Sequence, residues 1–75
     1  MELPNVFGER LKKVRIERGL NAIEIAKEIG LSKSAISQIE NGLIYPSATN
    51  IIKICQLLEV SADYLLGLSE TKERR

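Results

Sequence analysis

Four polar side chains recur at helical spacing between residues 33 and 38, and together they could hydrogen-bond to a flat polar partner. They are Lys33, Ser34, Ser37 and Gln38. Residues three and four positions apart lie on one face of a helix, so these four would share a surface. An ammonium group, two hydroxyls and a side-chain amide supply donors and acceptors that can reach base edges in the DNA major groove. Hydrogen bonding to bases is therefore the chemistry that this set of residues could do.

The residues around this surface carry the signals of two short helices joined by a tight turn. Asn21 can cap the first helix, with Glu24 completing a capping box, and Gly30 can end it in a left-handed conformation. Ser32 can cap the second helix, which Asn41-Gly42 ends. The apolar stripes of the two helices are formed by Ile25, Ala26, Ile29, Ala35, Ile36 and Ile39. A turn of only about three residues forces a steep crossing, which is typical of a helix-turn-helix.

Three further helices are expected around this unit. The first spans about residues 5 to 18 and ends at Gly19. Pro46 disfavours helix at Tyr45, and Ser47 and Ser61 can cap a fourth helix and a short fifth one. Their apolar positions are Phe7, Leu11, Val14, Ile51, Ile54, Cys55, Leu58, Tyr64, Leu65 and Leu66. We therefore predict an all-α fold, a compact five-helix bundle over residues 1–68, followed by a frayed, flexible charged tail over residues 69–75.

Several segments match one known family in order and spacing. They are FGERLKKVR, Ala26, Gly30, Ile36, IENG and YPS. From Phe7 to Leu66 the chain resembles the Cro and lambda-repressor type (XRE-like) helix-turn-helix family. The resemblance implies a lambda-repressor-like fold and a sequence-specific regulator of transcription that binds double-stranded DNA. It further implies a repressor that binds a palindromic operator as a homodimer, with residues 32–41 as the recognition helix.

In this family, the start and the outward face of the recognition helix contact bases. The resemblance assigns that role to Ser32, Lys33, Ser34, Ser37 and Gln38. Lys33 suits guanine O6 and N7, and Gln38 can bond to adenine N6 and N7. The alternative for each is an ordinary solvated surface residue, and for Ser32 the helix cap alone is a sufficient role.

Phosphate contacts are less well supplied, because the chain departs from the family at two positions. Ala22 stands where the family commonly has a polar residue, and LIYPS replaces a basic loop. The remaining candidates are Asn21, the backbone N–H of Ala22, Asn41, the Tyr45 hydroxyl, Arg10 and Lys12. Lys13 and Arg18 could contribute at longer range. The alternative for these basic side chains of the first helix is a solvated face paired with Glu9 and Glu17.

Two further groups of residues have structural roles. Arg15 and Glu40 fall at inward positions, and the resemblance implies that they form a structural ion pair; the alternative is two unrelated solvated charges. Related domains often pair through helices four and five, which makes Ile52, Leu57 and Tyr64 candidates for a dimer interface. Ile23, Leu43 and Ile44 add more apolar side chains than a small core needs. Some of these are expected at an interface or, alternatively, scattered on the surface.

The charge of the chain is low for a protein that binds nucleic acid. The formal net charge is +1; residues 1–20 carry +2 and residues 21–42 carry −1. We therefore expect weak non-specific affinity and a shallow salt dependence. Specific binding would then depend on dimerisation, which links two weak half-sites.

Composition argues against several other classes of protein. The chain has one cysteine, Cys55, and no histidine, so neither a disulfide scaffold nor a metal site is expected, and no cofactor is implied. We expect Cys55 to be buried and to act as a small apolar residue; the alternative is that its thiol serves as a redox switch. Without a long apolar run or a leader, we expect a cytoplasmic protein with no membrane partner. The family resemblance further implies a bacterial or phage origin. We expect no enzyme and no small-molecule substrate; a protein-interaction module, such as an antitoxin-like subunit, is the alternative function.

Overall fold

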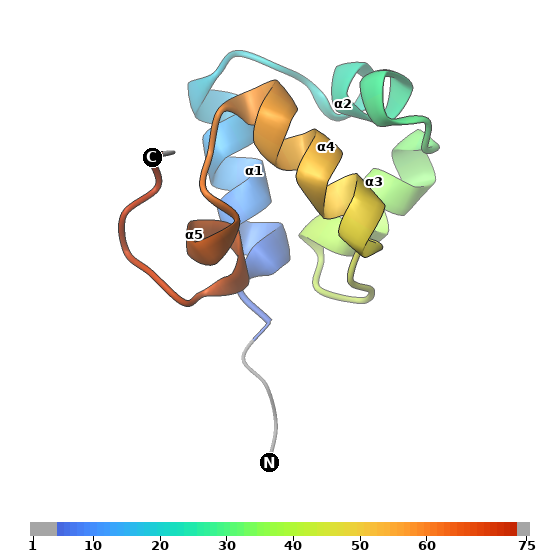
Figure 1. The fold of residues 1–75 in the computed structure, drawn as a ribbon. Coiled ribbons are helices and arrows are strands. Elements are labelled where there is room, and N and C mark those ends of the chain that lie inside the picture. Colours follow the sequence, from blue (N-terminus) through green and yellow to red (C-terminus); the bar gives the residue numbers. More distant parts are fainter. Residues whose placement is uncertain (1–4, 74–75) are drawn as a thin grey trace.

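The structure of the protein is a computed structural model that describes residues 5–73, and within them it contains five helices and no strand longer than an isolated bridge (Figure 1). The helices are α1 (Phe7–Glu17), α2 (Ala22–Ile29), α3 (Lys33–Glu40), α4 (Ala48–Leu58) and α5 (Ala62–Leu66). The predicted all-α architecture of five helices is confirmed. None of the helices in this described part of the chain has the length and apolar character needed to span a membrane.

Side-chain caps fix where four of the helices begin. Asn21 and Glu24 form the predicted capping box, with the Glu24 N–H donating to Asn21 Oδ1 at 2.8 Å and the Asn21 N–H donating to Glu24 Oε1 at 3.1 Å. Ser32, Ser47 and Ser61 each accept a bond from a backbone N–H three residues later. Gly30 adopts the left-handed conformation that ends α2. The turn between α2 and α3 is therefore set by local signals, as the sequence predicts.

The first helix is shorter than predicted. It begins at Phe7 instead of residue 5, because Val6 is an N-cap without a side chain that can accept a hydrogen bond. Asn5 lies outside the helix, and its side-chain amide donates to the carbonyl of Gly42.

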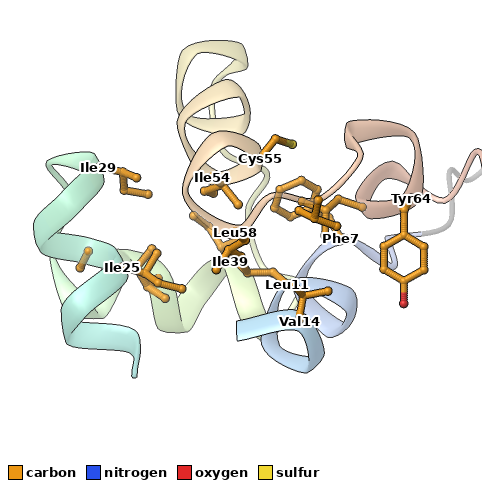
Figure 2. Packing of buried hydrophobic residues seen from close by; sticks show 14 residues of the cluster. Phe7, Leu11, Val14, Ile25, Ile29, Ile39, Ile54, Cys55, Leu58 and Tyr64 are labelled. Carbon is orange, nitrogen blue, oxygen red and sulfur yellow. The ribbon is translucent and has the colours of Figure 1, made fainter. Parts of the chain in front are cut away.

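Fourteen buried residues from all five helices and the α4–α5 connection form one core (Figure 2). It contains Phe7, Leu11, Val14, Ile25, Ala26, Ile29, Ile36, Ile39, Ile54, Cys55, Leu58, Val60, Tyr64 and Leu65. Ala35, Ile51 and Leu66, which the sequence also assigns to the core, are half-buried. The core packs α3 against α1 and α2, so α3 has a rigid support on two sides.

Helices α1 and α3 approach each other closely at Gly8. A methyl group at this position would overlap the backbone carbonyl oxygen of Ile39 and lie 2.7 Å from that of Glu40. Both atoms are backbone, so they cannot move aside as the end of a side chain could. Only glycine therefore permits this contact between the first turn of α1 and the last turn of α3.

Residues 69–73 run back along α1 and α5, where the sequence predicts part of a frayed tail. Arg10 donates to the carbonyl of Ser69 and to the carboxylate of Glu70, and Lys72 Nζ lies 2.8 Å from Glu17 Oε1. The Ser61 N–H donates to the Lys72 carbonyl, and Val60 and Glu73 form an antiparallel bridge. This segment is held by polar contacts instead of apolar packing. Its sequence therefore lacks regularly spaced apolar residues, and for that reason it resembles a tail. Residues 74 and 75 lie outside the described part of the chain.

Candidate nucleic-acid interface

The five residues predicted to contact bases lie together at the start and on the outward face of α3. Ser32, Lys33, Ser34, Ser37 and Gln38 are all exposed. The buried residues Ile36 and Ile39 hold the opposite face of α3 in the core. The hydroxyl oxygen of Ser32 accepts the Ala35 N–H at 3.0 Å, so this side chain caps the helix while remaining at the surface. The arrangement presents hydroxyl, amide and ammonium groups on one rigid helix face, as direct recognition of bases requires.

Asn41 extends this face by one further turn. It follows α3 directly as its C-cap residue and is exposed. Its position is three residues after Gln38 and seven after Ser34, so the three lie along one side of the helix. Asn41 is therefore placed beside the exposed polar face of α3.

An ion pair ties the recognition helix to α1. Arg15 Nε lies 2.7 Å from Glu40 Oε2, and Arg15 Nη2 lies 3.1 Å from Glu40 Oε1, which is the two-pronged geometry of a strong pair. The side chains are only 12% and 9% exposed. Arg15 Nη1 also donates to the carbonyl of Leu20, and the hydrogen bond to Glu40 raises the pKa of Arg15. One guanidinium therefore joins α1, the loop before α2 and the end of α3.

The start of α2 supplies two of the phosphate candidates. Asn21 is exposed, and its side-chain oxygen is used in the capping box. Ala22 is half-buried and is the first residue of the helix, where backbone N–H groups lack acceptors within the helix. This end of α2 can thus offer backbone donors to an anion, but the chain provides no longer side chain at residue 22.

The two basic candidates on α1 lie on different sides of that helix. Lys12 is exposed and shares a helix stripe with Gly8 and Arg15, both of which contact α3. Arg10 points to α5: Nη1 donates to the carbonyl of Tyr64 at 2.7 Å and to that of Ser69 at 2.9 Å. The assignment of Arg10 to phosphate contact is therefore corrected, since its guanidinium is used inside the domain. Lys12 remains at the edge of α1 next to the recognition helix.

Of the two more distant basic residues, Lys13 on α1 and its C-cap residue Arg18, only Arg18 differs from a simple solvated side chain. Arg18 Nε donates to the carbonyl of Leu58 at 2.9 Å, so this guanidinium caps the C-terminal end of α4. Lys13 is exposed. The bond from Arg18 to Leu58 and the bond from Arg10 to Tyr64 have no local sequence signal, because each joins segments 40 or more residues apart.

The loop between α3 and α4 exposes apolar side chains next to the polar face of α3. Leu43 is 72% exposed, and Ile44 and Tyr45 are exposed as well. The ring of Tyr45 packs edge-on against Phe7, with 6.3 Å between ring centroids. Because residues 41–47 contain no lysine or arginine, any phosphate contact from this loop must come from neutral polar groups.

Of the three candidates for a dimer interface, only one is well exposed. Ile52 on α4 is 58% exposed, whereas Leu57 is half-buried and packs on the core. Tyr64 is only 7% exposed, and it lies at the edge of the core with its hydroxyl directed away from the other labelled residues (Figure 2). Arg10 covers its ring. Tyr64 is therefore corrected from an interface candidate to a core residue; Ile23, Leu43 and Ile44 are exposed as expected.

Five helices with an exposed polar α3 face, held by α1 and α2, define a helix-turn-helix domain of the lambda-repressor type. A family profile described as "Helix-turn-helix" matches residues 11–65, and the chain belongs to this family, in its XRE-type branch. The family and the homologues of this chain are DNA-binding transcription regulators and not enzymes.

Known proteins similar to this chain support the assignment. The transcriptional regulator SinR of Bacillus subtilis is 37% identical over 62 residues, covering 81% of this chain and 56% of SinR. The P22 c2 repressor bound to a synthetic operator has a TM-score of 0.78 at 30% identity, covering 92% of this chain and all of the repressor chain. A crystal structure of SinR in complex with DNA has a TM-score of 0.73 at 38% identity, covering 80% and 97%. The chain spans 53% to 62% of the length of the first curated relatives it matches.

Proposed function

We propose that this chain is a sequence-specific regulator of transcription that binds double-stranded DNA through α3. The observation that carries the proposal is the exposed polar face of α3 on a helix fixed by the Arg15–Glu40 pair. Ser32, Lys33, Ser34, Ser37 and Gln38 read bases, and Asn21, the Ala22 N–H, Asn41, Tyr45 and Lys12 contact phosphates. Similarity to a repressor and a regulator that were solved in complex with DNA supports the same use of the fold.

The regulator acts as a repressor that binds a palindromic operator as a homodimer. One domain offers few charged contacts, since residues 21–42 carry a net charge of −1 and the loop after α3 is neutral. Two copies on half-sites whose centres lie about 34 Å apart would multiply these weak contacts. Exposed Ile52 and half-buried Leu57 are the remaining interface candidates on α4. Since the relatives come from bacteria and phages, the operator would lie on a bacterial or phage chromosome in the cytoplasm.

Selection from a random double-stranded DNA library, followed by sedimentation of the protein with the enriched sequence, tests this function. We expect an enriched palindrome and a complex of two protein chains per duplex. Failure to enrich any sequence at low salt would contradict DNA recognition. An enriched sequence without symmetry, bound by one chain, would contradict only the dimer.

A protein-interaction module is the second candidate function, favoured by the net negative charge of residues 21–42 and the neutral loop. It predicts that the chain enriches no DNA sequence yet forms a tight complex with one protein partner. The same library selection distinguishes the two functions.

A further inference from the structure

Asn5, two residues before the start of α1, holds the loop that follows the recognition helix. Asn5 Nδ2 donates to the carbonyl oxygen of Gly42 at 2.9 Å, joining segments 37 residues apart. Gly42 has a φ of +77°, and a methyl group there would lie 3.6 Å from Asn5 Nδ2. The Asn5 amide thus lies directly over the turn that ends α3.

The orientation of this amide is set by its acceptor. The opposite orientation would place Asn5 Oδ1 against the Gly42 carbonyl oxygen, and two acceptors facing each other repel. In the observed orientation Oδ1 is buried and has no partner, which among the described residues occurs at this side chain alone. A buried acceptor without a partner lowers stability. We therefore expect the amide to add little net stability and to act mainly by fixing the loop through its bond to Gly42.

A second contact holds the same loop further along. The rings of Phe7 and Tyr45 meet edge-on, with an angle of 62° between their planes. Residues 5–7 therefore contact the loop at Gly42 and again at Tyr45. Asn41 and Tyr45, the two loop residues proposed to contact phosphates, lie before and after Gly42, the residue that Asn5 holds.

We propose that Asn5 is a positioning residue for DNA binding, which acts by holding Asn41 and Tyr45 where they contact phosphates. This inference rests on the proposed function. Asn5 itself contacts no base, so it strengthens binding to every sequence equally and does not change which sequence is preferred.

The test compares Asn5→Ala and Asn5→Leu with the unchanged chain on the selected operator. Leucine matches asparagine in shape but has no donor, and it removes the unpaired acceptor together with the bond. We expect Asn5→Leu to weaken operator binding about threefold to tenfold, with a melting temperature within about 4 °C of the unchanged chain. The slope of log affinity against log salt should stay nearly unchanged, because Asn41 and Tyr45 are neutral and displace few counterions, and the ranking of operators with single base changes should also stay the same. Glu9→Gln, on the exposed side of α1, is the control and should change neither the operator affinity nor the melting temperature.

Two results would overturn the inference. One is an Asn5→Leu affinity within twofold of the unchanged chain, measured on folded protein. The other is a changed preference at a single base pair, which would make Asn5 a base-reading residue. If the unchanged chain selects no operator at all, the proposed function fails first, and this inference fails with it.

Discussion

The guanidinium group of Arg10 lies over the ring of Tyr64, with 4.4 Å between its central carbon and the ring centroid. The same group donates to the backbone carbonyls of Tyr64 and Ser69 and to the carboxylate of Glu70. One side chain therefore joins α1, α5 and the segment that follows α5. This junction gives structural roles to two residues that the sequence assigned to binding, Arg10 to phosphate and Tyr64 to a partner subunit.

Arg10→Ala should lower stability without weakening DNA binding. The change removes a charged donor of three hydrogen bonds and a cation–π contact, so we expect the free energy of unfolding to fall by about 2 kcal/mol. Operator affinity, measured at a temperature where the variant is folded, should stay within about twofold. Urea unfolding and DNA titration measure the two effects.

Lys12→Ala is the matched control on the same helix. It should leave stability nearly unchanged and weaken binding to all sequences, with a lower salt slope. An Arg10 variant that behaves like the Lys12 variant would contradict the structural role of Arg10.

Gly8→Ala should destabilise the domain, although alanine is the better helix former. Helix propensity alone would favour alanine by about 1 kcal/mol. The new methyl group would meet the backbone carbonyls of Ile39 and Glu40, so α1 and α3 must separate. We expect a net loss of about 1 to 3 kcal/mol in thermal or urea unfolding. Glu9→Ala on the exposed side of α1 is the control, and a Gly8 variant as stable as that control would show that the two helices can separate freely.

The structural features that were best predicted from the sequence are those that local contacts determine. The capping box at Asn21 and Glu24 and the serine caps each join residues three positions apart, so their signals lie within one short segment. Apolar spacing likewise predicted which helix faces are buried, because helical periodicity is regular. The fold class and the exposed α3 face could therefore be predicted.

The sequence could not predict contacts between distant segments. Nothing near Arg10 indicates that it meets Tyr64, 54 residues away, and nothing near Gly8 indicates a close helix crossing. Residues 69–73 lack apolar residues at regular spacing, so their polar contacts with α1 left no pattern. Asn5 had no signal beyond its position near a helix start. Such roles depend on tertiary packing, which periodicity does not specify.

Arg15→Ala should cost about 3 kcal/mol of unfolding free energy, because it leaves the carboxylate of Glu40 buried without its partner. Replacing both residues, Arg15 with methionine and Glu40 with leucine, should restore most of this loss. A double-mutant cycle measured by urea unfolding separates the interaction energy of the pair from the contributions of the two individual side chains. Single and double variants with equal, small losses would mean that the two charges are solvated.

The contact between Lys72 and Glu17 should be lost in acid. The hydrogen bond from Lys72 lowers the pKa of Glu17, so the folded state binds this proton less readily than the unfolded state. The contact is therefore complete above the unfolded pKa of about 4.3 and is lost as the pH falls through the lower, folded value. Both groups are at the surface, and the effect on overall stability should be small. Titration followed by NMR of the Glu17 carboxylate measures the shift, which Lys72→Ala should abolish.

Lys33→Ala and Gln38→Ala should each weaken operator binding by about 1 to 3 kcal/mol and relax the preference at one base position. Both side chains are exposed on α3, so the fold and the unfolding free energy should be retained. Affinities for operators with single base changes, measured at one salt concentration, identify the position that each residue reads. Lys27→Ala, which removes an exposed lysine from α2, is the control for loss of charge. Equal weakening on all sequences by the Lys33 or Gln38 variant would assign that residue to phosphate contact instead, because backbone contacts carry no sequence information.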